Sequence, residues 1–237
     1  MKGFGKPHRS GHHTEISIPA GTVALDGALE LPERTAAIVL FAHGSGSSRH
    51  SPRNRYVARV LQSHGIGTLL FDLLTGREES LDERSGALRF DIRFLANRLK
   101  DVTRWLIELP DLKGFHFGYF GASTGAAAAL VAASELPEAI GAVVSRGGRP
   151  DLARDSLSSV QAPTLLIVGG DDEPVIGMNR EAFSKLLCEK RLVIVPGATH
   201  LFEEPGALEE VARLAAEWFK QHLTTAVQSD ARRSASP

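Results

Sequence analysis

Short apolar runs alternate with longer amphipathic stretches along most of the chain. Each run consists mainly of apolar or β-branched residues and is bounded by Gly, Pro or Asp. This pattern is typical of strands that are buried on both faces of a sheet. We expect such strands at residues 36–43, 65–72, 115–121, 139–145, 163–170 and 191–197.

An earlier segment differs, because apolar and polar residues alternate in it. Residues His13–Gly21 and Thr22–Pro32 form two such stretches, one directly after the other. They predict an antiparallel hairpin at the edge of the sheet. The sheet would then have about eight strands.

Four longer stretches have apolar residues at helical spacing. In the first of them Val57, Val60 and Leu61 share a face, and Gly65 is placed to end the helix. The predicted helices cover residues 53–65, 88–109, 125–136 and 206–223. Repeated alternation of strand and helix predicts the α/β class, with a mostly parallel central sheet and helices on both faces.

The same pattern predicts one domain. Residues 14–222 contain no fixed-period repeat and no linker rich in Pro or Ser, whereas residues 1–13 and 223–237 lack periodicity, so we expect flexible ends there. The connection at residues 146–162 is too short for an inserted lid, and we expect no cap domain. The acidic segment 75–86 is either a solvated turn, the interpretation we favour, or a loop over the mouth of a site.

Composition and charge restrict the function classes. The 237-residue chain is 43% hydrophobic and 23% charged, which fits a globular protein and excludes collagen-like and fully disordered chains. The formal net charge of −1 gives no electrostatic reason to expect a nucleic acid or a membrane surface as partner. The single cysteine, Cys188, lies in a predicted helix and cannot form an internal disulfide. With no secretory signal and no membrane span, we expect a cytoplasmic protein.

The strongest local motif surrounds Ser123. Gly121, Ser123 and Gly125 form a G-x-S-x-G sequence between a predicted buried strand and an Ala-rich helix. On a sharp strand-to-helix turn of this kind a serine can act as a nucleophile, and the glycines avoid collisions where the backbone doubles back. The alternative is a Gly-Ser helix N-cap without chemistry.

A nucleophilic serine needs a base and an acid that orients the base. In this type of fold both follow the serine in the chain, first the acid and then the histidine. The strand at 163–170 runs into Asp171, Asp172 and Glu173, and the strand at 191–197 runs into His200. Carboxyl ends of parallel strands meet at one edge of a sheet, so His200 is the expected base. The residues themselves do not decide which of these three acids orients His200.

A Gly-rich loop follows the first buried strand at residues 42–48. Backbone N–H groups in such a loop, together with the amide after the nucleophile, can stabilise an oxyanion. We assign this role to the amides of Ser45 and Thr124. His43 precedes Ser123 in the chain, and we expect it to be a structural histidine that bridges loops.

These motifs together resemble the α/β-hydrolases. The chain is similar, over about residues 14–222, to the compact branch without a lid that includes dienelactone hydrolases and small carboxylesterases. In this branch the acid lies in a G-x-x-D-x-x-V pattern, so the resemblance implies Asp172 as the acid. Dienelactone hydrolases carry a cysteine nucleophile, whereas Ser123 stands here. The resemblance therefore implies serine ester hydrolysis rather than dienelactone opening. The matching segments are HGSG at 43–46, GASTG at 121–125, GGDDEPV at 169–175 and GATH at 197–200.

Arginines gather after two of the expected strands. Arg49, Arg53 and Arg55 follow the Gly-rich loop, and Arg146 and Arg149 follow the strand at 139–145. Guanidinium groups bind carboxylates and phosphates bidentately, so we advance the hypothesis that Arg53 or Arg146 holds an anionic group of the substrate. The alternative is loop salt bridges with Asp151 or Asp155, or solvation.

The sequence therefore predicts a serine hydrolase that cleaves small or short-chain carboxylic esters through an acyl-enzyme. The catalytic residues would be Ser123, Asp172 and His200. A lactone, dienelactone or thioester hydrolase with the same triad is the alternative within enzymes, and a non-catalytic ligand-binding module is the alternative outside them. No spacing implies a metal or a cofactor. The expected partner is a small ester, not a nucleic acid or a membrane, and either a monomer or a homodimer fits.

Overall fold

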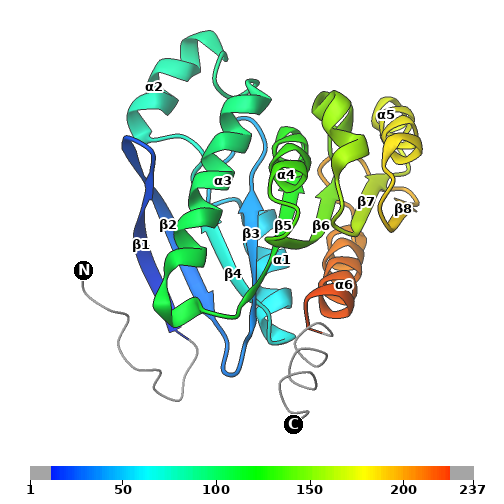
Figure 1. Cartoon of the computed structure of the whole chain (residues 1–237). Coiled ribbons are helices and arrows are strands. Elements are labelled where there is room, and N and C mark those ends of the chain that lie inside the picture. The colour runs from blue at the N-terminus through cyan, green and yellow to red at the C-terminus, as the bar shows by residue number, and fades with distance from the viewer. Residues whose placement is uncertain (1–11, 225–237) are drawn as a thin grey trace.

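The computed structural model describes residues 12–224, which form one eight-stranded sheet (Figure 1). The strand order is β1-β2-β4-β3-β5-β6-β7-β8. Strand β2 is antiparallel to both β1 and β4, and the remaining neighbours are parallel. The predicted edge hairpin and mostly parallel sheet are therefore confirmed. The strands are β1 (His12–Ala20), β2 (Val23–Leu31), β3 (Ala37–Ala42), β4 (Gly67–Phe71), β5 (His116–Ala122), β6 (Ile140–Arg146), β7 (Thr164–Gly169) and β8 (Lys190–Val195).

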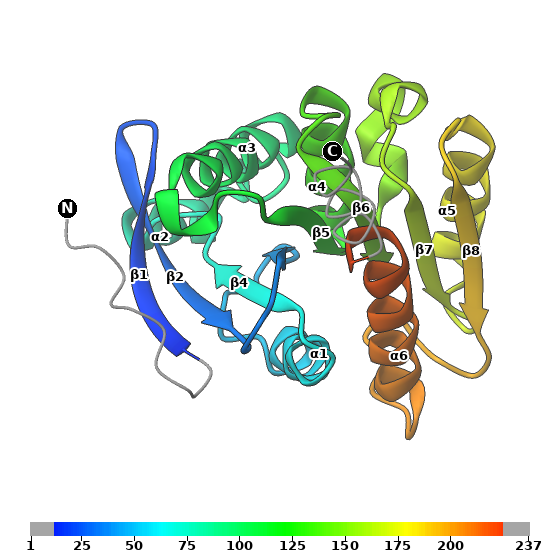
Figure 2. The same cartoon turned by 60° about the horizontal axis from the view of Figure 1, so that its bottom comes forward.

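Helices cover both faces of this sheet (Figures 1 and 2). In β3, Ile38 and Leu40 point into one hydrophobic core, and Val39 and Phe41 point into the other, because successive side chains of a strand face opposite sides. One core is covered by α3 (Ile92–Glu108), α4 (Thr124–Glu135) and α5 (Glu173–Lys185), and the other by α1 (Pro52–Ser63) and α6 (Ala207–Phe219). Burial on both faces explains the uninterrupted apolar runs of the central strands.

Several predicted boundaries differ from the structure. Helix α3 begins after Asp91, whose side chain accepts a hydrogen bond from the Phe94 amide at 2.9 Å, and not at residue 88. Strand β1 already includes His12, and a short π-helical segment, η3 (Lys220–Thr224), continues α6. Part of each element falls in a segment that we expected to be flexible: residues 12–13 of β1 and residues 223–224 of η3. The rest of those segments, residues 1–11 and 225–237, lies outside the described residues.

Cys188 does not lie in a helix, since α5 already ends at Lys185. A short 3-10 helix, η1 (Pro110–Leu112), follows α3, and a longer one, η2 (Pro150–Ser159), fills the connection between β6 and β7. Within residues 12–224 no inserted cap domain is present. Helix η2 packs against α4 and α5 beside the sheet.

The acidic segment that we favoured as a turn forms a helix, α2 (Gly76–Ser85). The Thr75 side chain accepts from the Glu78 amide at 3.2 Å, and the Glu78 carboxylate accepts from the Thr75 amide at 2.8 Å. This reciprocal cap stabilises the N-terminus of a helix that buries little apolar surface. Helix α2 stands at the upper edge in Figure 1.

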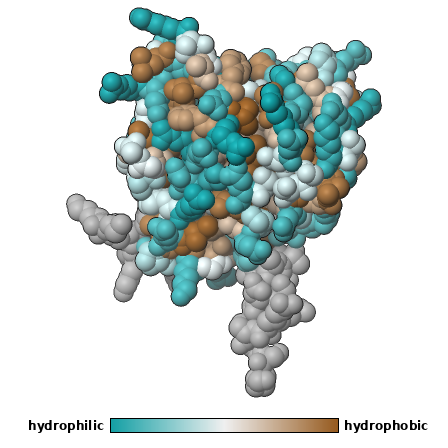
Figure 3. All heavy atoms as spheres, turned by 45° about the horizontal axis from the view of Figure 1, so that its top comes forward, coloured by the Kyte–Doolittle hydropathy of each residue, from teal (hydrophilic) through white to brown (hydrophobic). Residues whose placement is uncertain are grey.

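The carboxyl ends of the parallel strands lie at this upper edge. Seen from that side, hydrophilic residues surround smaller hydrophobic patches (Figure 3). No helix among residues 12–224 combines the length and apolar character that crossing a membrane requires.

Candidate active site

Ser123 occupies a strained turn between β5 and α4. Its backbone has φ 51° and ψ −122°, in the positive-φ region that residues other than glycine rarely adopt. A Cβ on Gly125 would come within 2.1 Å of the Ala42 carbonyl oxygen, and one on Gly121 within 2.4 Å of the Ala126 Cα. Both glycines are therefore required for the close approach of β5, α4 and the loop after β3. The turn holds Ser123 half-buried at the edge of the sheet.

The loops after β7 and β8 bring an acid to a histidine. Oδ2 of Asp172 lies 2.7 Å from Nδ1 of His200, although 28 residues separate them in the chain. The Asp172 side chain is 12% exposed and that of His200 is 38% exposed. Asp171 and Glu173 are exposed to solvent. Of the three acids that the sequence left open, Asp172 is the one in contact with the histidine.

Backbone contacts keep these two loops together. The amides of Gly170 and Asp171 donate to the carbonyl oxygens of Val195 and Ala198 at 2.8 and 3.0 Å. A Cβ on Gly169 would lie 2.3 Å from the Ala198 carbonyl oxygen, so the approach requires glycine. The GGDD segment therefore fixes the position of Asp172 beneath the loop that carries His200.

Ser123 and His200 line the same pocket, which has a volume of about 210 Å³. The Ser123 amide donates to the Arg146 carbonyl oxygen at 3.3 Å, and a Cβ on the next residue, Gly147, would lie 3.6 Å from Cε1 of His200. With Nδ1 bonded to Asp172, Nε2 is the remaining ring nitrogen, and among residues 12–224 no hydrogen bond joins it to Ser123. The side chains predicted as a triad are thus gathered in one place.

The Gly-rich loop after β3 lies directly against Ser123. A Cβ on Gly44 would come within 3.0 Å of the Ser123 Cβ. The Ser45 amide donates to the Thr124 hydroxyl at 3.0 Å, a contact between residues 79 positions apart. The Thr124 amide belongs to the first turn of α4, where a helix offers no acceptor of its own. In this conformation the Ser45 amide, assigned to an oxyanion from the sequence, therefore already has an acceptor.

His43 fixes the base of the Gly-rich loop. Its Nδ1 lies 3.0 Å from the Gly44 carbonyl oxygen, and its Nε2 accepts from the Leu73 amide at 3.0 Å. Because Nε2 accepts a hydrogen bond, it carries no proton. The proton of the ring is therefore on Nδ1, which donates to the Gly44 carbonyl oxygen, and the imidazole is neutral. Burial lowers the pKa of His43 below its ordinary value, which also favours the neutral form. The expected bridging role of this histidine is confirmed.

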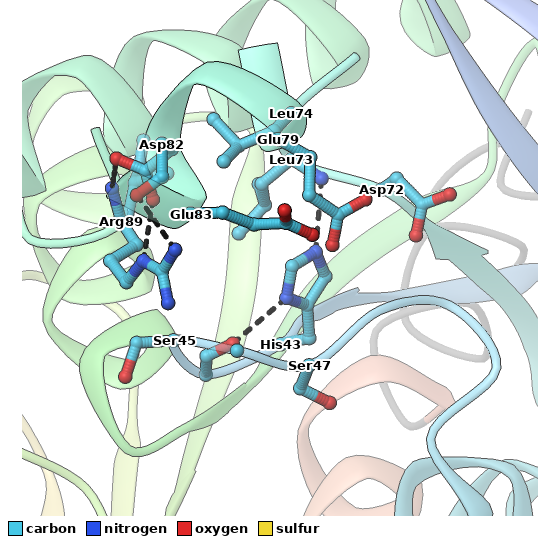
Figure 4. A pocket seen from close by; sticks show the side chains of 13 residues that line it. His43, Ser45, Ser47, Asp72, Leu73, Leu74, Glu79, Asp82, Glu83 and Arg89 are labelled. Carbon is cyan, nitrogen blue, oxygen red and sulfur yellow. Dashed lines mark hydrogen bonds and ion pairs between the residues drawn. The ribbon is translucent and has the colours of Figure 1, made fainter. Parts of the chain in front are cut away.

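A second hollow of about 220 Å³ lies on the other side of the Gly-rich loop. Figure 4 shows Glu79 and Glu83 of α2 above His43 and Ser45, with the ion pair between Asp82 and Arg89 at one side. The helix that the sequence did not predict thus forms a wall next to the candidate site. Its apolar positions have no period, but the spacing of Thr75 and Glu78 matches a capping box and could have indicated the start of the helix.

The predicted arginines separate into two groups. Arg149 pairs with Asp151 at 2.8 Å and Arg49 pairs with Asp72, so the salt-bridge interpretation applies to both. Arg53 and Arg146 both line the pocket of Ser123 and His200, and Arg53 also pairs with the exposed Glu203 at 2.9 Å. The sequence did not point to Asn54, which lines the same pocket, or to Phe202, whose ring lies 5.9 Å from the Arg146 guanidinium carbon.

No metal-binding cluster stands out in the described part of the chain. Residues 12–224 contain no group of three or more His, Cys, Asp or Glu side chains arranged to hold an ion. The pockets beside Ser123 are bounded by the Gly-rich loop, α1, α2 and the loop after β8.

Comparison with known proteins yields one family. A model of the Dienelactone hydrolase family matches residues 25–226. A crystal structure of a dienelactone hydrolase from Anabaena variabilis is 60% identical, with a TM-score of 0.89, and the match covers 91% of this chain and 100% of that one. An esterase from Pyrococcus furiosus shares the fold at 19% identity, with a TM-score of 0.71 over 90% of this chain and 94% of that one.

A longer relative carries a different name. A Mycobacterium tuberculosis protein named "Putative phosphoribosyl transferase" is 59% identical over 209 residues. These residues are 88% of this chain and 46% of that protein. The chain thus spans about half the length of this relative.

Proposed function

Since the chain belongs to the dienelactone hydrolase family, we propose that it is a serine hydrolase that cleaves carboxylic esters through an acyl-enzyme. One observation carries the proposal. Ser123, on a strained turn, shares a pocket with His200, whose Nδ1 is held at 2.7 Å by Asp172. A purely structural serine would not require a positive φ angle, two closely packed glycines and an oriented histidine.

The reaction begins with the serine. Oγ of Ser123 attacks the ester carbonyl carbon while Nε2 of His200 takes the hydroxyl proton. Asp172 accepts the hydrogen bond from Nδ1, which fixes the tautomer and stabilises the imidazolium. The imidazolium then gives its proton to the departing alkoxide, and the alcohol leaves. Water, deprotonated by His200, attacks the acyl-enzyme and releases the acid, and Ser123 regains its proton.

The negative oxygen of each tetrahedral intermediate needs donors that are already in position. We propose the Thr124 amide as the first donor, because it points out of the first turn of α4. The Ser45 amide is the second, and it serves once its hydrogen bond to the Thr124 hydroxyl opens or is shared. The N-terminal end of α4 adds the positive end of a helix dipole next to Ser123.

The expected substrates are small. A pocket of about 210 Å³ without a cap domain accommodates a short acyl chain or a compact alcohol better than a long lipid. Lactone or thioester cleavage would use the same groups, and the relative named a dienelactone hydrolase makes lactones the first alternative to test. Phosphoribosyl transfer is not proposed, because that name belongs to a protein about twice as long.

A substrate series tests the proposal. The wild-type protein and Ser123→Ala are compared on p-nitrophenyl esters from acetate to decanoate, together with simple lactones, thioesters and amides. We expect activity on short esters that falls with chain length and disappears in Ser123→Ala. If no ester, lactone or thioester is turned over, the non-catalytic ligand-binding alternative replaces the proposal.

We also propose that the protein works in the cytoplasm on a small-molecule ester. Its single cysteine, Cys188, is a free thiol and half-buried, which fits a reducing compartment.

A further inference from the structure

A buried arginine lies in the candidate active site without a carboxylate partner. Arg146 is the last residue of β6 and is only 6% exposed. Its Nη2 donates to Oδ1 of Asn54 at a long 3.4 Å, and its Nε has no acceptor. Among residues 12–224, no Asp or Glu forms an ion pair with it. By contrast, Arg149, three residues further on, is paired with Asp151.

This arginine keeps its charge at neutral pH. Burial and, secondarily, the nearby Arg53 lower the pKa of Arg146 to about 10, which still leaves the guanidinium protonated near pH 7. An unpaired buried charge costs several kcal/mol unless something compensates it. Within an active-site pocket, a ligand of opposite charge is the natural source of that compensation.

A second guanidinium faces the same space. Arg53 lies in the first turn of α1 and lines the pocket with Arg146. Its Nη1 donates to Glu203 at 2.9 Å, but Glu203 is 64% exposed, and its Nε is buried without an acceptor. An exposed ion pair of this kind contributes at most about 1 kcal/mol, so Arg53 can readily turn to a ligand.

The N-terminus of α1 points to the same ligand. Ser51, the N-cap, and Asn54 line the pocket beside the two arginines. The positive end of the α1 dipole lies at this first turn. Pro52 has no N–H and the Asn54 amide donates to the Ser51 hydroxyl at 3.3 Å, so the contribution of the helix is that of its dipole and not of a row of free amides. Two guanidiniums, one from the first turn of α1 and one from the end of β6, suit a group with more than one negative charge and several acceptor oxygens.

We propose that this pocket binds a phosphate group carried by the ester substrate, with Arg146 and Arg53 as its counter-ions. The inference rests on the proposed ester hydrolysis and specifies its substrate class. A phosphate monoester carries a charge of about −1.5 to −2 at pH 7 and offers three acceptor oxygens. It matches two guanidiniums, whereas one carboxylate would be satisfied by a single bidentate arginine. The phosphate is bound and not cleaved, because Ser123 attacks the carbonyl carbon.

Three matched esters test the inference. They share a butyryl group and a three-carbon alcohol: 1-butyrylglycerol 3-phosphate, the neutral 1-butyrylglycerol and the carboxylate 3-butyrylglycerate. We expect kcat/KM for the phosphate ester to exceed that for the neutral ester at least tenfold. Arg146→Gln and Arg53→Gln should each bring that ratio towards one. Arg149→Gln, whose side chain is paired elsewhere, is the matched control and should keep the wild-type ratio.

A measurement on the wild type covers the case in which Arg146→Gln does not fold. Glycerol 1-phosphate should inhibit hydrolysis of 1-butyrylglycerol competitively, and glycerol at equal concentration should not. Hydrolysis of the neutral ester with no advantage for the phosphate ester overturns this inference but keeps the proposed function. A carboxylate ester that is preferred over the phosphate ester overturns the choice of phosphate. Hydrolysis of none of the three esters overturns the proposed function itself.

Discussion

Oδ2 of Asp172 lies 2.7 Å from Nδ1 of His200, a contact that joins the loop after β7 to the loop after β8. The distance is short for a nitrogen–oxygen hydrogen bond and is typical of one that involves a charged carboxylate. The His200 side chain also lines the pocket of Ser123, and Nε2 is the ring nitrogen that Asp172 leaves free. The proposed chemistry depends on this orientation, and the first prediction follows from it.

Replacement of the acid by its amide should abolish most activity without unfolding the protein. Asp172→Asn keeps the shape of the side chain but favours the wrong histidine tautomer. We expect kcat to fall about 10³-fold or more, as in other triads of this type. Asp171→Asn is the matched control, since its side chain points to solvent, and it should retain wild-type activity. Equal loss in both variants would contradict the role given to Asp172.

The packing around the serine turn predicts that replacing Gly125 by alanine destabilises the protein, whereas the same change at Gly177 does not. Gly125→Ala places a Cβ against the carbonyl oxygens of Ala42 and His43, at 2.1 and 2.5 Å. Because these are backbone atoms, we expect a loss of at least about 3 kcal/mol in the free energy of unfolding. Gly177→Ala is the control. It lies in α5 with no atom within 4 Å of its Cβ position and should stabilise the protein by about 0.5–1 kcal/mol.

Features that depend on local sequence patterns could be predicted from the sequence, except where a pattern was not recognised. The buried strands, the edge hairpin and the serine turn depend on local patterns, and these were predicted correctly. Helix α2 was not, because it has no apolar face and the capping-box spacing of Thr75 and Glu78 was not recognised. The start of α3 was also misjudged, since the capping role of Asp91 was not recognised.

Within the candidate site, the features that depend on contacts between distant segments could not be predicted from the sequence. The residues left three acids open, and only the register of the loops after β7 and β8 brings Asp172 to His200. The hydrogen bond from Ser45 to Thr124 spans 79 positions and has no local signal. Arg149 pairs with Asp151 two residues away, whereas the environment of Arg146 depends on Asn54 of α1 and Phe202 of the loop after β8. A sequence shows that arginines are present but not which of them lack a carboxylate.

Arg146 should lower the stability of the protein, because its buried charge has no carboxylate partner and only a long hydrogen bond to Asn54. Arg146→Met removes the charge and keeps much of the apolar volume. We expect the free energy of unfolding to rise by about 1 kcal/mol, measured by urea denaturation without ligand. Arg149→Met should instead lower it slightly, through loss of the pair with Asp151. A clear destabilisation by Arg146→Met would indicate a structural arginine and contradict the anion-binding role.

Phosphate binding should weaken at high pH. The pKa of Arg146 is about 10, so the guanidinium loses its proton as the pH rises through that value. A phosphate monoester remains a dianion throughout, since its second pKa is about 6. Inhibition by glycerol 1-phosphate should therefore be constant from pH 8 to 9 and decline above pH 10. The inhibition constant for hydrolysis of 1-butyrylglycerol measures this, and a constant value up to pH 11 would contradict the lowered pKa of Arg146.

Active-site labelling tests the central claim most directly. The folded protein is treated with a fluorophosphonate, and the intact mass and the labelled peptide are determined by mass spectrometry. We expect one adduct per chain, located on Ser123, and no adduct in Ser123→Ala. Absence of labelling in the wild-type protein, or an adduct on another residue, would contradict a nucleophilic role for Ser123.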